Sequence, residues 1–233
     1  MIDFHSHILP EIDDGSRSLE ESMAMLRMER EQGVTHVVAT PHFYARHDKP
    51  EKFLARRDRA EECLRREMEK EEGLPELFVG AEVHYFPGIS HSEILPQLTI
   101  RGKLCIMIEM PGVSWPESVF RELQQIYDRW GIVPIIAHID RYIRPWYAHR
   151  IWEKLQDLPV LIQANAEFFL ESKTSRKAMR MLKKDRIHLL GSDCHDLDSR
   201  KPDLGEAIAA IEKRLSSEAV ARIESNGRSI LNL

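Results

Sequence analysis

The chain has 233 residues, of which 42% are hydrophobic and 30% charged, and its formal net charge is −5 at pH 7. This length suffices for one large domain with a substantial core, and the composition is typical of a soluble globular protein. The acidic balance, with no basic tail, argues against a dedicated nucleic-acid binder, and no stretch approaches the roughly 20 apolar residues that a membrane span needs.

Short apolar runs alternate with longer helical patterns along the chain. Seven runs are predicted to be buried strands, at residues 2–6, 36–40, 77–83, 104–109, 133–138, 160–164 and 187–191. Helices are predicted at 18–32, where Ser18 and Glu21 have capping-box spacing, and at the charged segments 50–72 and 176–186, which we interpret as surface helices. Strands that alternate with helices indicate a parallel sheet. Seven such units without a dinucleotide-binding glycine fingerprint favour a barrel over an open sheet.

The sequence contains no repeat, low-complexity segment or linker, so residues 1–233 are expected to form a single domain. The three cysteines, Cys63, Cys105 and Cys194, are widely spaced and indicate neither a disulfide framework nor a zinc finger. Polar residues at positions 3, 5 and 7 occupy the place of a signal peptide's apolar region, so a cytoplasmic protein is expected.

Six of the seven predicted strands end in residues that bind metal ions. These residues are His5, His7, His42, Glu82, Glu109, His138, Asp193 and His195, and only the sixth strand ends differently, in Asn165. Alternate residues of a strand share a face, so His5 and His7 are expected to point the same way. By the same rule Asp3 would share their face and support an imidazole, whereas Cys194 would point to the opposite face from its neighbours.

Active sites of α/β barrels lie at the carboxyl ends of the strands, so these groups are expected to meet at one mouth. Burying so many ionisable groups there without a cation would be very costly. Imidazoles and carboxylates without a thiolate suit Mn, Fe or Zn. One aspartate from Asp13 or Asp14 brings the set to nine, enough for two or three ions, and clustered ions suit the hydrolysis of phosphate esters.

The segments DFHSH, ATPH, GAE, IE, AHIDR and GSDCH resemble the PHP (polymerase and histidinol phosphatase) superfamily in order and spacing, over essentially the whole chain. More narrowly, MIDFHSHILPEIDDGSRSLEES, HIDRY and SDCHDLDSRKP resemble the bacterial manganese-dependent protein-tyrosine phosphatases encoded with capsule and exopolysaccharide synthesis genes. The resemblance implies an α/β fold, a distorted (β/α)7 TIM-like barrel (the PHP fold), with its metal site at the C-terminal ends of the strands.

The resemblance also implies three metal ions, with Mn2+ expected and Fe or Zn possible. Ion by ion, the implied ligands are His5, His7, Glu82 and Asp193, then Glu82, Glu109 and His138, and then Asp14, His42 and His195. Asp14 is preferred to Asp13 because it is the second aspartate of the DDG motif. Arg141 and Arg200 would orient the phosphate and stabilise the transition state, since a guanidinium fork suits phosphate oxygens.

The implied function is hydrolysis of phosphotyrosine by attack of a metal-bridging hydroxide. The implied partner is the phosphotyrosine-containing tail of a bacterial tyrosine kinase that regulates capsular or exopolysaccharide synthesis, with no nucleic acid and no membrane insertion. A general acid, if one is used, would be a metal-site histidine or Asp140. The alternatives are a phosphatase of a small phosphomonoester such as histidinol phosphate and a non-catalytic, metal-stabilised interaction domain.

Two further features of the sequence concern substrate and mechanism. Phe43, Tyr44 and Arg46 are predicted at the rim of the site, either as a platform for an aromatic phosphoester or as ordinary loop packing, and residues 146–150 are a second rim segment.

Cys194 and Arg200 have the Cys-x5-Arg spacing of cysteine-dependent phosphatases. We reject that mechanism because the intervening loop has no glycine and carries aspartates that would repel phosphate and raise the pKa of the thiol.

Overall fold

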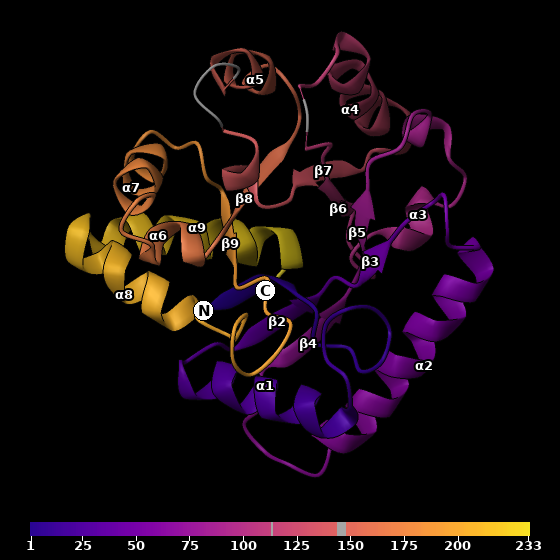
Figure 1. Cartoon of the computed structure of the whole chain (residues 1–233), viewed down its shortest axis with the longest axis vertical. Helices are drawn as coiled ribbons and strands as arrows, with labels where there is room; N and C mark the ends of the chain where they lie inside the picture. Colours follow the sequence, from indigo (N-terminus) through magenta and orange to yellow (C-terminus); the bar gives the residue numbers. More distant parts are fainter. Residues whose placement is uncertain (113, 144–147) are drawn as a thin grey trace.

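A curved set of parallel strands forms the centre of the molecule, and helices surround it (Figure 1). The computed structural model describes residues 1–112, 114–143 and 148–233, so part of the predicted rim segment 146–150 lies outside the described residues. The strands are β1 (Ile2–Ser6), β2 (His36–Ala39), β3 (His42–Phe43), β4 (Glu76–Val79), β5 (Glu82–His84), β6 (Cys105–Glu109), β7 (Val133–Ile136), β8 (Leu161–Asn165) and β9 (Leu189–Gly191).

The strands form two parallel sheets that together make a half-barrel. One sheet has the order β1-β2-β4 and the other the order β3-β5-β6-β7-β8-β9. An isolated parallel bridge between Ser6 and Cys194 joins β1 to the segment after β9. The predicted strand 77–83 is two strands, because the chain leaves one sheet after β4 and enters the other at β5. The predicted α/β barrel-type fold is confirmed.

Eleven helical segments are described. They are α1 (Leu19–Glu31), α2 (Pro50–Met68), η1 (Ile89–His91), α3 (Leu95–Leu98), α4 (Glu117–Trp130), η2 (Ile139–Arg141), α5 (Ala148–Leu155), α6 (Glu167–Leu170), α7 (Ser175–Lys183), α8 (Leu204–Arg214) and α9 (Ser217–Leu231). The Ser18 hydroxyl accepts a hydrogen bond from the Glu21 backbone N–H at 3.2 Å, so the predicted cap of α1 is confirmed. The Glu21 carboxylate accepts instead from the Arg17 backbone N–H, at 2.6 Å.

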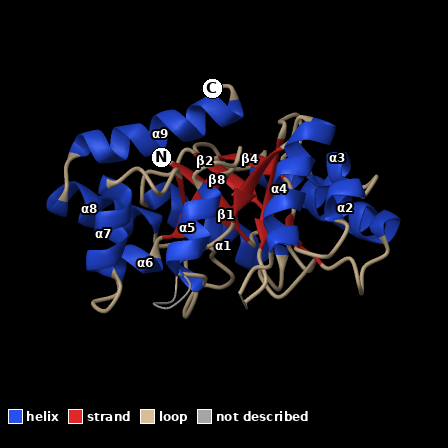
Figure 2. Cartoon of the chain, turned by 90° about the horizontal axis from the view of Figure 1, so that it is seen from above, coloured by secondary structure: helices blue, strands red, loops and turns tan. Residues whose placement is uncertain are grey.

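Apolar side chains fill both faces of the strand set, as expected for a parallel sheet covered by helices. A small core cluster includes Phe4, Met107, Ile135 and Leu189, and each of these residues is at most 1% exposed. Helix α9 lies across the strands close to the start of the chain (Figure 2). Among the described residues, no helix has the length and apolar character needed to cross a membrane.

Candidate metal centre

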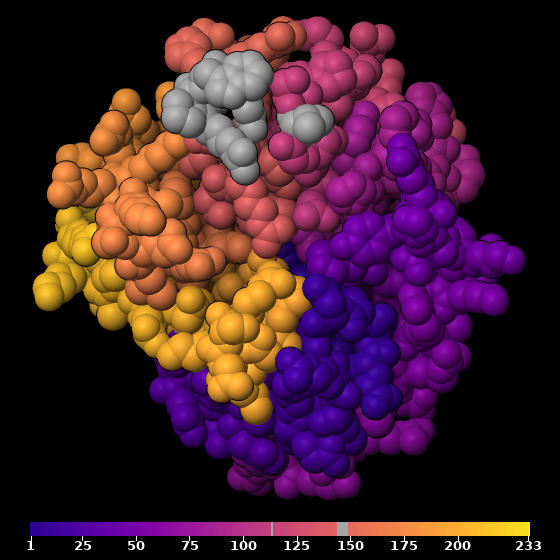
Figure 3. Space-filling view, viewed as in Figure 1, coloured from indigo at the N-terminus to yellow at the C-terminus, as the bar shows by residue number. Residues whose placement is uncertain are grey.

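The carboxyl ends of the strands bring the predicted metal-binding groups into one cluster. In the space-filling view, the indigo N-terminal region, the magenta middle and the orange region after β9 meet at the centre of one face (Figure 3). All nine residues that the sequence singled out belong to this cluster: His5, His7, Asp14, His42, Glu82, Glu109, His138, Asp193 and His195. The cluster consists of three overlapping groups.

The first group is buried and surrounds a single point. The Nε2 atoms of His5 and His7 are 3.2 Å apart. From His5 Nε2 the distances are 3.2 Å to Glu82 Oε2 and 3.5 Å to Asp193 Oδ1, and His7 Nε2 lies 3.4 Å from each of the same two oxygens. Two ligands bound to one ion at about 2.0–2.2 Å lie roughly 3.0–3.5 Å from each other. These four groups therefore have the mutual spacing of ligands to a common ion.

The second group shares Glu82 with the first. Its other carboxylate oxygen, Oε1, lies 2.7 Å from His138 Nε2, and that nitrogen lies 3.7 Å from Glu109 Oε1. A carboxylate with one oxygen toward each group has the geometry of a bridging ligand, as the sequence resemblance implied for Glu82.

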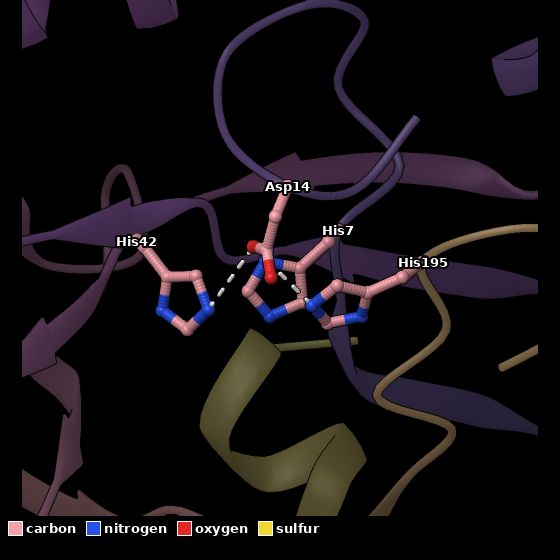
Figure 4. A group of neighbouring side chains, drawn as sticks. All are labelled: His7, Asp14, His42 and His195. Carbon is pink, nitrogen blue, oxygen red and sulfur yellow. Dashed lines mark ion pairs between the residues drawn. The ribbon is translucent and has the colours of Figure 1, made fainter. Parts of the chain in front are cut away.

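The third group contains Asp14, which the loop after β1 carries over the imidazoles (Figure 4). Asp14 Oδ1 lies 3.5 Å from His42 Nε2 and 3.6 Å from His195 Nε2. The rings of His7 and His195 lie 3.9 Å apart between centroids. The Asp14 side chain is 66% exposed, so this group opens to solvent whereas the first is closed.

Three buried polar atoms of the cluster have no hydrogen-bond partner among the described residues. They are Glu82 Oε2, His42 Nδ1 and His195 Nε2. Glu82 Oε2 lies only 3.0 Å from His42 Nδ1, yet the two atoms are not aligned for a hydrogen bond. A buried polar atom left unpaired costs about 1–3 kcal/mol, and a bound cation would satisfy it. The residues therefore fit a metal centre.

Asp13 and Asp14 have different positions, although they are adjacent in sequence. The Asp13 carboxylate accepts hydrogen bonds from His7 Nδ1 at 2.8 Å, from the His42 backbone N–H at 2.9 Å and from the Gly15 backbone N–H at 3.0 Å. It faces the side of the His7 ring opposite Nε2. Asp14 is the residue that faces the cluster, which agrees with the preference for it in the sequence.

The prediction that Asp3 shares a face with His5 and His7 is wrong. The pairing of β1 with β2 shifts register between Asp3 and Ser6, and such a bulge breaks the alternation of faces. Asp3 instead accepts hydrogen bonds from the His5 backbone N–H at 3.0 Å and from Ser192, through its N–H at 3.0 Å and its hydroxyl at 2.5 Å. It lies beside buried Glu29 and supports the backbone rather than an imidazole ring.

The electrostatics of the cluster favour ionised carboxylates. Burial alone would raise the pKa of Glu82 and of Asp193, but the charge and hydrogen bonds of the surrounding imidazoles, His5 foremost, outweigh burial and hold both pKa values well below their usual range. Burial and the neighbouring His7 lower the pKa of His195 to about 4. Burial would also lower the pKa of His5 and of His7, but the surrounding carboxylates outweigh burial and raise both, so a metal ion would displace protons from these two imidazoles. Carboxylate anions and neutral imidazoles are the protonation states that bind metal ions.

The two predicted arginines converge on one oxygen of the cluster. The Nη2 atoms of Arg141 and Arg200 lie 2.8 and 2.9 Å from Asp193 Oδ2, and Asn165 Nδ2 donates to the same oxygen at 2.8 Å. Arg141 also lies 3.4 Å from Glu109 Oε1. Both side chains are about 40% exposed, so they border the cluster on its open side.

Three supporting residues were not identified from the sequence. His84 Nδ1 lies 2.9 Å from Glu109 Oε2, the Tyr142 hydroxyl lies 3.2 Å from His138 Nδ1, and the Gln163 side-chain oxygen accepts from the His138 backbone N–H at 2.6 Å. The position of His84, two residues after Glu82 in one strand, was the available signal. Nothing in the sequence linked Gln163 to His138, because their contact depends on the packing of β8 beside β7.

The predicted rim platform is only partly present. Phe43 is 1% exposed and packs against Phe53 with ring centroids 5.0 Å apart, so it belongs to the core. Tyr44 is 36% exposed, and its ring centroid lies 5.2 Å from that of His42, at the edge of the cluster. Arg46 is exposed nearby.

The structure agrees with rejecting Cys194 as a nucleophile. Its side chain is fully buried, and burial raises the pKa of the thiol well above its usual range. In the loop that follows, the Asp196 carboxylate accepts the backbone N–H groups of Asp198 and Arg200, at 2.7 and 3.0 Å. Those N–H groups are therefore engaged by a carboxylate and not directed at a phosphate.

The fold and this cluster define an α/β barrel-type protein with imidazoles and carboxylates gathered at the carboxyl ends of its strands. The model of the family described as capsular polysaccharide synthesis, CpsB/CapC, matches residues 1–232, and the chain belongs to this family.

Individual relatives match along almost their whole length. The tyrosine-protein phosphatase CpsB of Streptococcus pneumoniae is 31% identical over 242 residues, covering 99% of this chain and 98% of its own. The tyrosine-protein phosphatase YwqE of Bacillus subtilis is 28% identical, with 99% and 91% covered.

A solved structure from work on YwqE of B. subtilis and CpsB of S. pneumoniae, described as unique metal-dependent tyrosine phosphatases, superposes with a TM-score of 0.88 at 25% identity, over 100% of this chain and 94% of the other. A β-aspartyl dipeptidase from Fervidobacterium islandicum, at a TM-score of 0.56 and 16% identity, covers 99% of this chain and 74% of its own and shares the fold alone.

Proposed function

We propose that this chain is a metal-dependent protein-tyrosine phosphatase that hydrolyses phosphotyrosine. The observation that carries the proposal is the cluster of buried imidazoles and carboxylates with three unpaired polar atoms, described above. The names of relatives that match almost the whole chain support it, because they are tyrosine-protein phosphatases. We further propose that residues 1–233 act as one domain.

The metal ligands in this proposal are the nine residues of the cluster. His5, His7, Glu82 and Asp193 would hold the first ion, and Glu82 would be shared with a second ion bound by Glu109 and His138. Asp14, His42 and His195 would hold a third. Clustered divalent ions, with Mn2+ proposed here, lower the pKa of bound water and neutralise charge on a phosphoryl group.

The residues of the chain orient the substrate and stabilise developing charge. Arg141 and Arg200 each place one guanidinium nitrogen on Asp193, and Arg141 also directs Nη1 at Glu109 and His138. Their N–H groups that are not engaged in these contacts are available for phosphate oxygens on the exposed side. Burial raises the pKa of the Asp140 carboxyl, which suits a group that holds a proton, but a phenolate is a good enough leaving group to depart without one. The choice between Asp140 and a histidine stays open.

The proposed substrate is the phosphotyrosine-containing tail of a bacterial tyrosine kinase. The description of the family as capsular polysaccharide synthesis supports a partner in that process. We propose that this reaction takes place in the cytoplasm, as expected from the sequence.

The test is hydrolysis of a phosphotyrosine peptide by metal-stripped protein, with Mn2+ added back, beside a Cys194→Ser variant. We expect chelation to abolish turnover, Mn2+ to restore it and the variant to remain active, because the Cys194 thiol is buried behind the cluster. Activity that survives chelation and disappears in the variant would refute the metal-centre mechanism. If histidinol phosphate is hydrolysed and the peptide is not, a small phosphomonoester replaces phosphotyrosine as the proposed substrate. If the peptide, histidinol phosphate and p-nitrophenyl phosphate all remain intact, the non-catalytic alternative is favoured.

A further inference from the structure

A groove of about 410 Å³ lies beside the metal centre, between the loops that follow β3 and β5. Strands β3 and β5 are paired neighbours, so the two loops leave the sheet side by side (Figure 1). The side chains that line the groove and matter here are Tyr44, Arg46, His84, Phe86, Pro87 and Pro111.

The groove adjoins the metal centre, although none of the nine cluster residues lines it. The Tyr44 ring, in its wall, lies 5.2 Å from the ring of His42 and 5.5 Å from that of His84, between centroids. His84 in turn contacts Glu109 at 2.9 Å. A peptide whose phosphate reached the cluster would therefore place its neighbouring residues along this groove.

A well-ordered turn presents Arg46 at the edge of the groove. The backbone N–H groups of His47 and Asp48 both donate to the Tyr44 carbonyl, at 2.9 and 2.8 Å. The Asp48 carboxylate accepts the Tyr44 backbone N–H at 2.9 Å and pairs with Arg56 of α2 at 2.9 Å. The turn is thus tied to a long helix, and the backbone that carries Arg46 is held in place at the edge of the groove.

The charge of the groove suits an anion. Its described lining residues include no carboxylate, and the two carboxylates next to them are engaged, Glu109 by His84 and Glu122 by Tyr85. The structure shows no ion pair between Arg46 and any residue that it describes. The rest of the lining consists of two histidines, His47 and His84, and of aromatic, proline and alanine side chains. An exposed arginine beside two imidazoles and apolar walls matches a peptide in which an acidic residue has apolar neighbours.

We infer that this groove binds the peptide on one side of the phosphotyrosine and that Arg46 selects substrates with an acidic residue there. The inference rests on the proposed function and adds a sequence preference to it. It also separates peptide substrates from small phosphoesters, because a small molecule seated at the cluster would not extend to Arg46.

The experiment compares two phosphotyrosine peptides that differ only in the residues flanking the phosphotyrosine, aspartate and glutamate in one and asparagine and glutamine in the other. The Mn2+-loaded wild type is measured beside Arg46→Glu and the matched control Arg59→Glu. Arg59 is exposed on α2 and lines a different groove, so its replacement changes the net charge equally.

We expect the wild type to prefer the acidic peptide by about two- to fivefold in kcat/KM, mainly through KM, as one exposed charge pair would give. The Arg46→Glu variant is expected to lose or reverse the preference, and the Arg59→Glu variant to keep it. Equal hydrolysis of both peptides by the wild type would overturn the inference and leave the proposed function standing. An equal loss of preference in both variants would also overturn it, since net charge would then be the cause. If the wild type hydrolyses neither peptide, both this inference and the proposed function are wrong.

Discussion

The position of Asp13 gives a prediction that separates a metal ligand from a residue that orients one. Its carboxylate receives three hydrogen bonds, and one of them comes from His7 Nδ1 at 2.8 Å, on the ring edge opposite the nitrogen that faces the cluster. A hydrogen bond at this position fixes the orientation of an imidazole and makes it a better ligand. We expect Asp13→Ala and Asp13→Asn to weaken Mn2+ binding although neither change removes a proposed ligand.

The size of the effect follows from the hydrogen bonds that each variant retains. Loss of a partner that orients a metal ligand costs about 10- to 100-fold in metal affinity, or roughly 1.4–2.7 kcal/mol. Alanine removes all three hydrogen bonds, so we expect it near the upper end. Asparagine can direct its oxygen at His7 and His42 and lose only the bond from Gly15, so we expect it near tenfold.

The assay is competition for Mn2+ between the protein and a fluorescent chelator, with thermal unfolding of the metal-free variants as a control for folding. Asp14→Ala serves as the comparison, because it removes a proposed ligand from the exposed third group only. An Asp13→Ala variant that folds and binds Mn2+ as tightly as the wild type would refute the orienting role. A complete loss of one bound ion on Asp13→Ala, with none lost on Asp14→Ala, would instead show that Asp13 is the ligand.

Three other changes test the packing and charge around the centre. Glu29→Gln should raise the free energy of unfolding of the metal-free protein at pH 8 and have little effect near pH 4. Burial and the nearby Asp3 carboxylate raise the pKa of Glu29, so the native state retains a proton that the unfolded chain releases as pH rises. Urea unfolding at several pH values measures this difference. Gly191→Ala should lower the free energy of unfolding by about 1–3 kcal/mol and weaken metal binding, because the new alanine Cβ would lie 2.5 Å from His5 Cβ and 2.7 Å from His5 N. Unchanged thermal unfolding of this variant would contradict the close packing. Arg141→Ala should reduce kcat on p-nitrophenyl phosphate about 100-fold at saturating Mn2+, and a kcat within twofold of the wild type would exclude a role in the transition state.

Much of the centre could be predicted because its residues follow apolar runs directly. A strand of a parallel barrel must be apolar to be buried, so a histidine or carboxylate at its end is conspicuous in the sequence, as His138 after Ile135–Ile136 is. The strand order then brings these ends together whatever the exact register. This is why residues as distant as His7 and His195 could be assigned to one site before their contact was known.

The tertiary structure decided the details that depend on register and on contacts between distant segments. The bulge in β1 turned Asp3 away from the imidazoles, and the loop after it gave Asp13 the role that the sequence had suggested for Asp3. No local pattern encodes a bulge, because it arises from how β1 pairs with β2 and with the segment around Cys194. Residue chemistry and spacing therefore determined which groups form the metal centre. Long-range pairing of the strands determined which other residues support those groups and how the groove beside the centre is shaped.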